Sequence, residues 1–196
     1  MYVPFRNGKE MSQLLKKFGI QYGEYMISDV VYEDQTEGCY CDFMKEEIDK
    51  KFGKTFIDSL LRVSDSLYVK NNISGTFDYT ICDTRPNYPK DTVSASDEYS
   101  EVFQRDFDTK VKYPVGYIKS PGHNTPAFAD VRLYVDKLGN ATITSCWFYF
   151  DIKKNHRYEK YFENKIQNIM QKTGWTPAII RKQKVNSDMV MRLGLD

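Results

Sequence analysis

The C-terminal third of the chain, residues 129–196, constrains the fold most because its apolar pattern changes period along the sequence. Apolar and polar residues alternate from 131 to 136, strand-forming residues return at 141–150, and alternation resumes at 189–195. A period of two is typical of strands with one buried face. From 158 to 170 the apolar residues instead recur at steps of three and four, which predicts an amphipathic helix. The order strand, turn, strand, helix, strand predicts an α+β fold, in which a small antiparallel sheet has a helix packed on one face.

The turn residues in this third are those that such a unit needs. Gly139, in the stretch Asp-Lys-Leu-Gly-Asn, tolerates the positive φ that a hairpin turn requires. Gly174 suits the end of the helix, and Pro177 just beyond it cannot continue that helix. We expect Trp175 to close the edge of the core between helix and sheet.

The first half of the chain is predicted to be mainly helical. Two helices, at 42–52 and 54–69, have apolar stripes and are expected to pack as a pair. One or two strands accompany them, at 22–32 and 76–82. Residues 85–97 are rich in Pro, Ser and Asp without periodicity, which favours a linker or a long surface loop. The expected parts are therefore a mainly helical region at 1–84, this linker at 85–97, and an α+β domain at 98–196.

The composition of the chain argues against nucleic acid and membranes as partners. Lys and Arg number 28 against 27 Asp and Glu, and the formal net charge of +1 gives no electrostatic footprint for nucleic acid or an anionic membrane. No apolar run is long enough to span a bilayer, and residues 1–20 lack the apolar core of a signal peptide. The aromatic content of 15% favours sheet packing and interaction surfaces. We therefore predict a protein partner, no nucleic acid and no membrane span.

Side chains able to do chemistry are few and scattered. His123 lies in a Pro-Gly loop and His156 at a helix start, and neither has the spacing of a metal site or a nucleophile's base. A cysteine hydrolase would need Cys146 near His156, or Cys41 near His123. The four cysteines permit disulfides without fixing them, and their state stays open: Cys39, Cys41, Cys82 and Cys146. We predict no enzymatic activity, no catalytic residue, no cofactor and no metal.

Several positions of the C-terminal region follow a recurring order: a strand of the form L-x-V-D-x-x-G, a helix, a Trp-x-Pro step, and a Val that opens the last strand. These positions are Leu133, Val135, Asp136, Gly139, Trp175, Pro177 and Val185. A short apolar pair and a Tyr-Pro step precede them, at Val102-Phe103 and Lys112-Tyr113-Pro114. The pattern resembles the C-terminal domain of TonB-type energy transducers, whose strand reads V-x-V-D-x-x-G, and the resemblance covers residues 98–195.

This resemblance implies a TonB C-terminal-like domain in a periplasmic or secreted protein that binds a protein partner and does no catalysis. In such a domain the last strand offers its open edge to a partner segment by β-strand addition. The residues then expected to bind the partner are Met189, Val190, Met191, Arg192 and Leu193. The alternative is a stand-alone inhibitor or immunity-type protein that binds through the aromatic first half. Neither the partner's identity nor the oligomeric state follows from the sequence.

Overall fold

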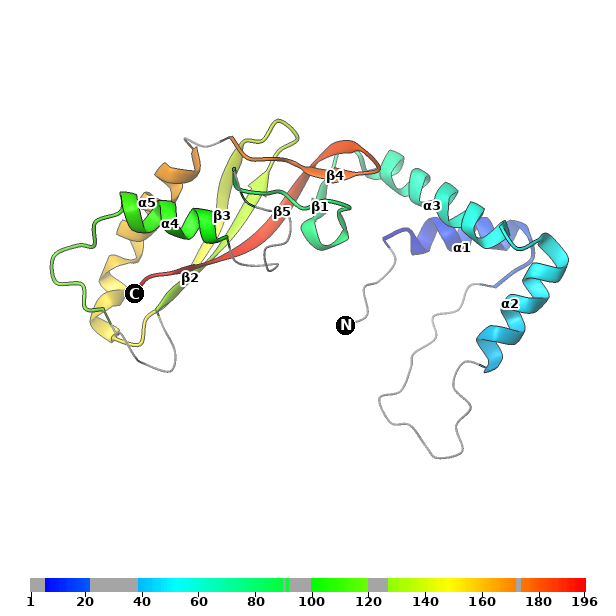
Figure 1. The fold of residues 1–196 in the computed structure, drawn as a ribbon, viewed down its shortest axis with the longest axis horizontal. Helices are drawn as coiled ribbons and strands as arrows, with labels where there is room; N and C mark the ends of the chain where they lie inside the picture. The colour runs from blue at the N-terminus through cyan, green and yellow to red at the C-terminus, as the bar shows by residue number, and fades with distance from the viewer. Residues whose placement is uncertain (1–5, 22–38, 90, 92–99, 120–126, 172–173) are drawn as a thin grey trace, which may run out of the picture. The chain divides into compact units, whose positions relative to one another are not determined.

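The computed structural model of the chain describes residues 6–21, 39–89, 91, 100–119, 127–171 and 174–196 (Figure 1). The chain divides into two compact units, Met1–Asn72 and Ile73–Asp196. The described part of the first unit is helical, whereas the second contains a five-stranded sheet together with helices. The predicted α+β class is therefore confirmed.

The N-terminal unit contains, in its described residues, the helices α1 (Gly8–Lys17), α2 (Cys39–Phe52) and α3 (Phe56–Asn72). Gly53, with a φ of 91°, ends α2 in the left-handed region that favours glycine. The helices α1 and α3 share one buried apolar cluster, formed by Met11, Leu15 and Leu60. The helices predicted at 42–52 and 54–69 are thus confirmed, while the strand predicted at 22–32 lies outside the described residues.

The C-terminal unit contains all five described strands. Two helices and two short 3-10 turns accompany them. The elements in chain order are β1 (Thr76–Asp78), η1 (Tyr79–Ile81), α4 (Glu101–Lys110), β2 (Phe128–Val135), β3 (Ala141–Tyr149), η2 (Lys153–Tyr158), α5 (Glu159–Gln171), β4 (Ala178–Ile180) and β5 (Gln183–Gly194). The predicted unit of hairpin, helix and last strand corresponds to β2, β3, α5 and β5.

The sheet is built on β5, the long red strand in Figure 1, and has the order β1-β5-β2-β3. One side of β5 pairs with β2 in antiparallel register, from Phe128↔Gly194 to Val135↔Ser187. On its other side, β1 pairs parallel, starting at Thr76↔Asn186. The short strand β4 pairs antiparallel with the start of β5, before the residues that pair with β2. The sheet is therefore mixed, and the prediction of an antiparallel sheet is wrong for β1. A three-residue strand whose partner lies far along the chain leaves no local signal of its direction.

One face of the sheet forms the core of this unit with α4 and α5 (Figure 1). Successive strand residues point to opposite faces, and the odd-numbered residues of β2 and β5 point to this one. The helix predicted over 158–170 is α5, and its apolar stripe packs here as expected. The side chains of this core with no exposed surface are Ala129, Val131, Leu133, Val135, Phe103, Phe107, Phe162, Ile166, Met170 and Leu195.

The described part of the predicted linker, residues 85–89 and 91, packs against the C-terminal unit. The backbone of Asn87 donates to and accepts from Thr176, with N···O distances of 3.0 and 2.9 Å. Tyr88 is buried, and its ring makes an edge contact with Trp175 at a centroid distance of 5.4 Å. The Tyr88 hydroxyl donates to Asp106 on α4 at 2.8 Å. Residues 92–97 of the predicted linker lie outside the described residues.

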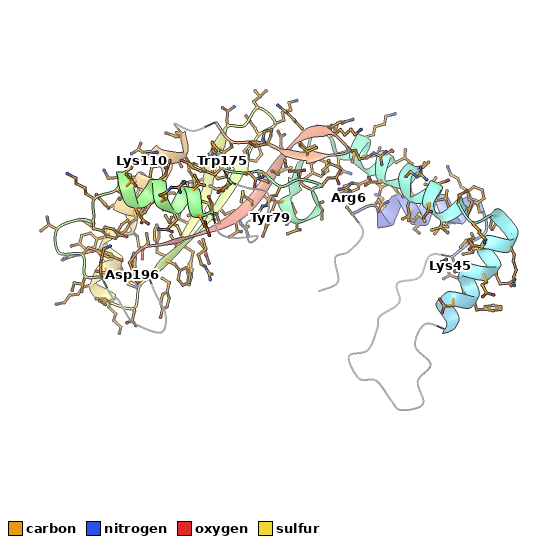
Figure 2. All side chains as sticks on the ribbon, in the orientation of Figure 1. Arg6, Lys45, Tyr79, Lys110, Trp175 and Asp196 are labelled. Carbon is orange, nitrogen blue, oxygen red and sulfur yellow. The ribbon has the colours of Figure 1, made fainter. Side chains whose placement is uncertain are left out.

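Gly139 and Trp175 are in direct backbone contact although a helix separates them in the sequence. The Trp175 N–H donates to the Gly139 carbonyl at 2.9 Å, and Gly139 has a φ of 89°. A Cβ at position 139 would lie 2.2 Å from the Trp175 carbonyl oxygen. Trp175, labelled in Figure 2, is only 5% exposed, so the prediction that it closes the core is confirmed.

We expect Gly139→Ala to destabilise the C-terminal unit by at least about 2 kcal/mol, because it adds a backbone clash to an unfavourable φ. Gly174→Ala is the matched control, since a Cβ there meets no atom within 4 Å. Its effect should stay within about 0.5 kcal/mol. Urea unfolding followed by tryptophan fluorescence measures both, because the two tryptophans, Trp147 and Trp175, lie in this unit. Equal unfolding midpoints for the two variants would contradict the expectation.

The carboxylate of Asp136 holds the hairpin turn before β3. It accepts hydrogen bonds from the backbone N–H of Leu138 at 2.8 Å and from Asn140, whose backbone and side-chain nitrogens lie at 2.9 and 2.8 Å. Burial raises the pKa of Asp136, but these hydrogen bonds outweigh it and hold the pKa below the ordinary 3.8. A depressed pKa in the folded state stabilises the fold above the unfolded value and ceases to do so as the pH falls through the folded value.

Asp136→Asn should therefore cost about 1 kcal/mol of unfolding free energy at neutral pH, because it weakens hydrogen bonds to a charged acceptor. The difference between wild type and variant should be constant above about pH 4 and shrink as the pH falls further. Urea unfolding midpoints at a series of pH values measure this difference. A difference that grows on acidification would show that the sign is wrong.

Candidate functional site

The strand β3 lies at the end of the sheet and pairs only with β2 among the described strands. Its nine residues read ATITSCWFY, with no charged residue and no proline. Natural edge strands are usually short, charged, interrupted by proline or covered, because an open edge pairs with other chains. The main irregularity in β3 is a register shift opposite Arg132/Leu133, where the Thr144 hydroxyl donates to the Arg132 carbonyl at 3.2 Å.

The direction of the backbone groups of β3 follows from two hydrogen bonds at the end of β5. Leu195 N–H donates to the Ala127 carbonyl, so the backbone N–H and C=O groups of odd-numbered β5 residues point toward β2. The backbone N–H of Gly194 points to the other side, where it bonds to Gln104. Because bonding sides alternate along antiparallel strands, the even-numbered residues of β2 face β3. In the register Asp130↔Trp147, the backbone N–H and C=O groups of Trp147 therefore point toward β2. The backbone N–H groups of Cys146 and Phe148 point outward, away from β2. The outer edge of β3 thus presents unpaired donors and acceptors within the described structure.

Both faces of this edge carry apolar side chains that are only partly covered. Ile143, Cys146 and Phe148 are half-buried on the face that carries α5. On the opposite face Trp147 is 57% exposed and Tyr149 is half-buried. A strand added beside β3 would cover apolar surface on both faces while pairing its backbone.

The sheet face opposite α4 and α5, here called the outer face, carries an aromatic cluster. Phe128 stacks on Tyr149 with ring centroids 5.3 Å apart, and Trp147 lies 5.6 Å from Phe128. The Arg192 guanidinium lies over the Phe128 ring at 4.1 Å and makes a two-pronged ion pair with Asp130 at 2.7 and 2.8 Å. These contacts fix a rigid aromatic surface next to the β3 edge.

The residues predicted to bind the partner lie on β5, and the structure divides them between the two faces. Met189, Met191 and Leu193 point into the core and are 7%, 2% and 1% exposed, whereas Val190 and Arg192 lie on the outer face. The side of β5 away from β2 is paired with β1 at residues 186–188. At its end the Gln104 side-chain amide bonds both backbone groups of Gly194, at 2.8 and 3.1 Å. Most of these side chains therefore serve the core.

The groups considered for catalysis are held in ordinary surroundings. His156 Nδ1 lies 2.7 Å from the Glu159 carboxylate on an exposed turn. Burial, with a smaller contribution from Glu163, raises the pKa of the Cys146 thiol to about 11 despite the opposing charge of Lys160. A thiol with this pKa is a poor nucleophile at neutral pH, which does not favour a hydrolase. The Cys82 thiol is half-buried and lies 3.4 Å from the Asp78 carbonyl oxygen, while His123 and the side chains of Cys39 and Cys41 lie outside the described residues.

In the described residues, no cluster of three or more His, Cys, Asp or Glu side chains is placed to hold a metal ion. Among the helices of the described part, none has the length and apolar character needed to cross a bilayer.

We expect the rate of Cys146 alkylation by iodoacetamide to rise with pH as a thiol with a pKa of about 11 ionises, not one with the ordinary pKa of 9.0. In a variant with Cys39, Cys41 and Cys82 replaced by Ser, the rate at pH 8 should be about 100-fold below that of an exposed cysteine, because the thiolate fraction is lower. Mass spectrometry over a pH series gives the inflection. An inflection near pH 9 would contradict the burial of this thiol.

The residues that carry the resemblance to TonB-type domains lie close together in the C-terminal unit. Gly139 and Trp175 share a hydrogen bond, Pro177 is buried between Trp175 and β4, and Val185 pairs with Ala178 at the start of β5. No protein-family model, no curated protein and no solved structure matches the chain.

Proposed function

We propose that the chain is a non-enzymatic protein-interaction module that binds an extended partner segment as an added strand on the outer edge of β3. The observation that carries this proposal is an uncharged nine-residue edge strand with outward backbone groups and partly covered apolar side chains on both faces. In strand addition the main-chain hydrogen bonds supply affinity, and alternate side chains supply specificity. The edge of β3 offers both.

A comparison of the outer edges of β5 and β3 supports β3 as the binding edge. On the side of β5 away from β2, β1 pairs with residues 186–188 and the Gln104 amide bonds both backbone groups of Gly194. The edge of β3 has no comparable cover among the described residues, although it is longer than β1 and β4 together. A chain that protects one edge in this way and leaves the other uncharged favours binding at the second.

The TonB C-terminal-like assignment and an exported location belong to this proposal as well. The order of hairpin, α5, the Trp175–Pro177 bend and β5 supports the assignment. The resemblance points to the last strand as the binding edge, whereas the geometry favours β3. The two edges make different predictions and are separated by proline substitutions.

The test selects displayed random peptides, somewhat longer than β3, on the full chain and measures the affinity of the selected peptides for variants. Cys146→Pro removes an outward N–H of β3 and leaves the pairing with β2, a position where an edge strand tolerates proline. We expect at least about a tenfold loss of affinity, since a backbone bond is lost and the proline ring blocks approach. Cys146→Ala keeps the N–H and should bind as wild type.

Val190→Pro is the matched change on β5, because the Val190 N–H also faces away from β2. If β3 is the binding edge, this variant retains affinity, and tryptophan fluorescence confirms that both proline variants are folded. Loss of binding with Val190→Pro alone would move the site to the last strand. Equal binding by all three variants would refute strand addition at either edge.

A further inference from the structure

Arg132 is an exposed cation near the middle of the outer face. It lies on β2, and its direct cross-strand neighbours are Ser145 on β3 and Val190 on β5. Neither neighbour carries a charge. Within the described residues its guanidinium makes no ion pair or hydrogen bond, in contrast to Arg192, which is paired with Asp130. Arg132 is therefore a cation available to a bound group.

The small size of Ser145 gives this cation a path to the β3 edge. Neighbouring strands are about 4.8 Å apart, so an added strand would lie roughly 10 Å from β2. An arginine side chain extends far enough to cross one strand when the residue between is as small as serine. The next residue of β3 on the outer face is Trp147, which is large and exposed. An added strand would thus present one side chain to Arg132 and, two residues along, another to Trp147.

We propose that Arg132 makes the β3 edge selective for partner segments with an acidic residue opposite Ser145 and an apolar residue opposite Trp147. This inference rests on the proposed strand addition and names the kind of segment that is added. Charge complementarity selects the first position, because a carboxylate there pairs with a cation that the chain leaves unpaired. Apolar contact with the exposed ring selects the second.

The charges elsewhere on the outer face favour a segment with a single carboxylate over a polyanion. Asp130 lies next to Trp147 in the register, and Asp188 lies on the same face of β5. Asp78 of β1 is the parallel partner of Asp188 and points to that face too. Arg192 already neutralises Asp130, but Asp188 and Asp78 would repel a phosphate backbone, so single-stranded nucleic acid on the aromatic cluster is disfavoured.

The experiment compares peptides selected from the random displayed library on the wild-type full chain and on Arg132→Glu. We expect wild-type selections to place Asp or Glu two residues from an apolar residue, and Arg132→Glu selections to place Lys or Arg there instead. An acidic wild-type peptide should lose about tenfold in affinity for Arg132→Glu. Lys154→Glu makes the same change of net charge at another exposed site of this unit and should change the affinity less than about threefold.

The outcomes separate this inference from the strand addition on which it rests. Selected peptides that lose affinity for Cys146→Pro but show no acidic position, or no response to Arg132→Glu, would overturn the role of Arg132 alone. Peptides indifferent to Cys146→Pro would overturn both proposals. A dimer of the chain that Cys146→Pro dissociates, with no peptide selected, would assign the edge to a second copy. Binding of a single-stranded oligonucleotide that Trp147→Ala abolishes would assign the outer face to nucleic acid.

Discussion

The pairing of β2 with β5 is the constraint on which the C-terminal unit depends. It joins residues 128–135 to 187–194 in one antiparallel ladder and aligns their odd-numbered side chains on the core face. Every other element is placed relative to this ladder: β3 extends it on the β2 side, β1 extends it on the β5 side, β4 pairs with the start of β5, and α4 and α5 cover its apolar face. A one-residue slip would exchange the core with the outer face, and the buried apolar residues fix the register against it.

Much of this unit is encoded by local pattern and could be predicted. The alternation of 131–136 and the stripe of α5 identified the elements, because burial on one face forces a period on the sequence. The Gly139 turn and the buried Trp175 followed from residue chemistry that few other side chains can replace. Their direct contact could not be predicted, since it depends on how α5 returns the chain to the hairpin.

The identity of the strand at the end of the sheet illustrates what local pattern leaves out. A strand's neighbours are set by long-range pairing, so β1 on the outer side of β5 is invisible in the residues of either strand. The same pairing makes β5 an interior strand at residues 187 and 188, where β1 and β2 flank it, and β3 is the strand at the other end of the sheet. The signal available for β3 was its lack of charge, which is equally typical of an interior strand.

The outer face also shows why charge counts alone are a poor guide to recognition. The chain is nearly neutral, yet two arginines of its outer face differ in whether they are free to bind a carboxylate. Arg192 and Arg132 lie on adjacent strands and are offset by two residues in the register. Arg192 is ion-paired with Asp130, and its guanidinium packs over the Phe128 ring, so it helps to hold the aromatic cluster in place. The guanidinium of Arg132 stays hydrated until a carboxylate of a bound segment replaces the water. That exchange adds little to the affinity, but it distinguishes acidic segments from others. Affinity at such an edge comes from backbone bonds common to all sequences, so selectivity has to come from neighbours of the edge such as Arg132 and Trp147.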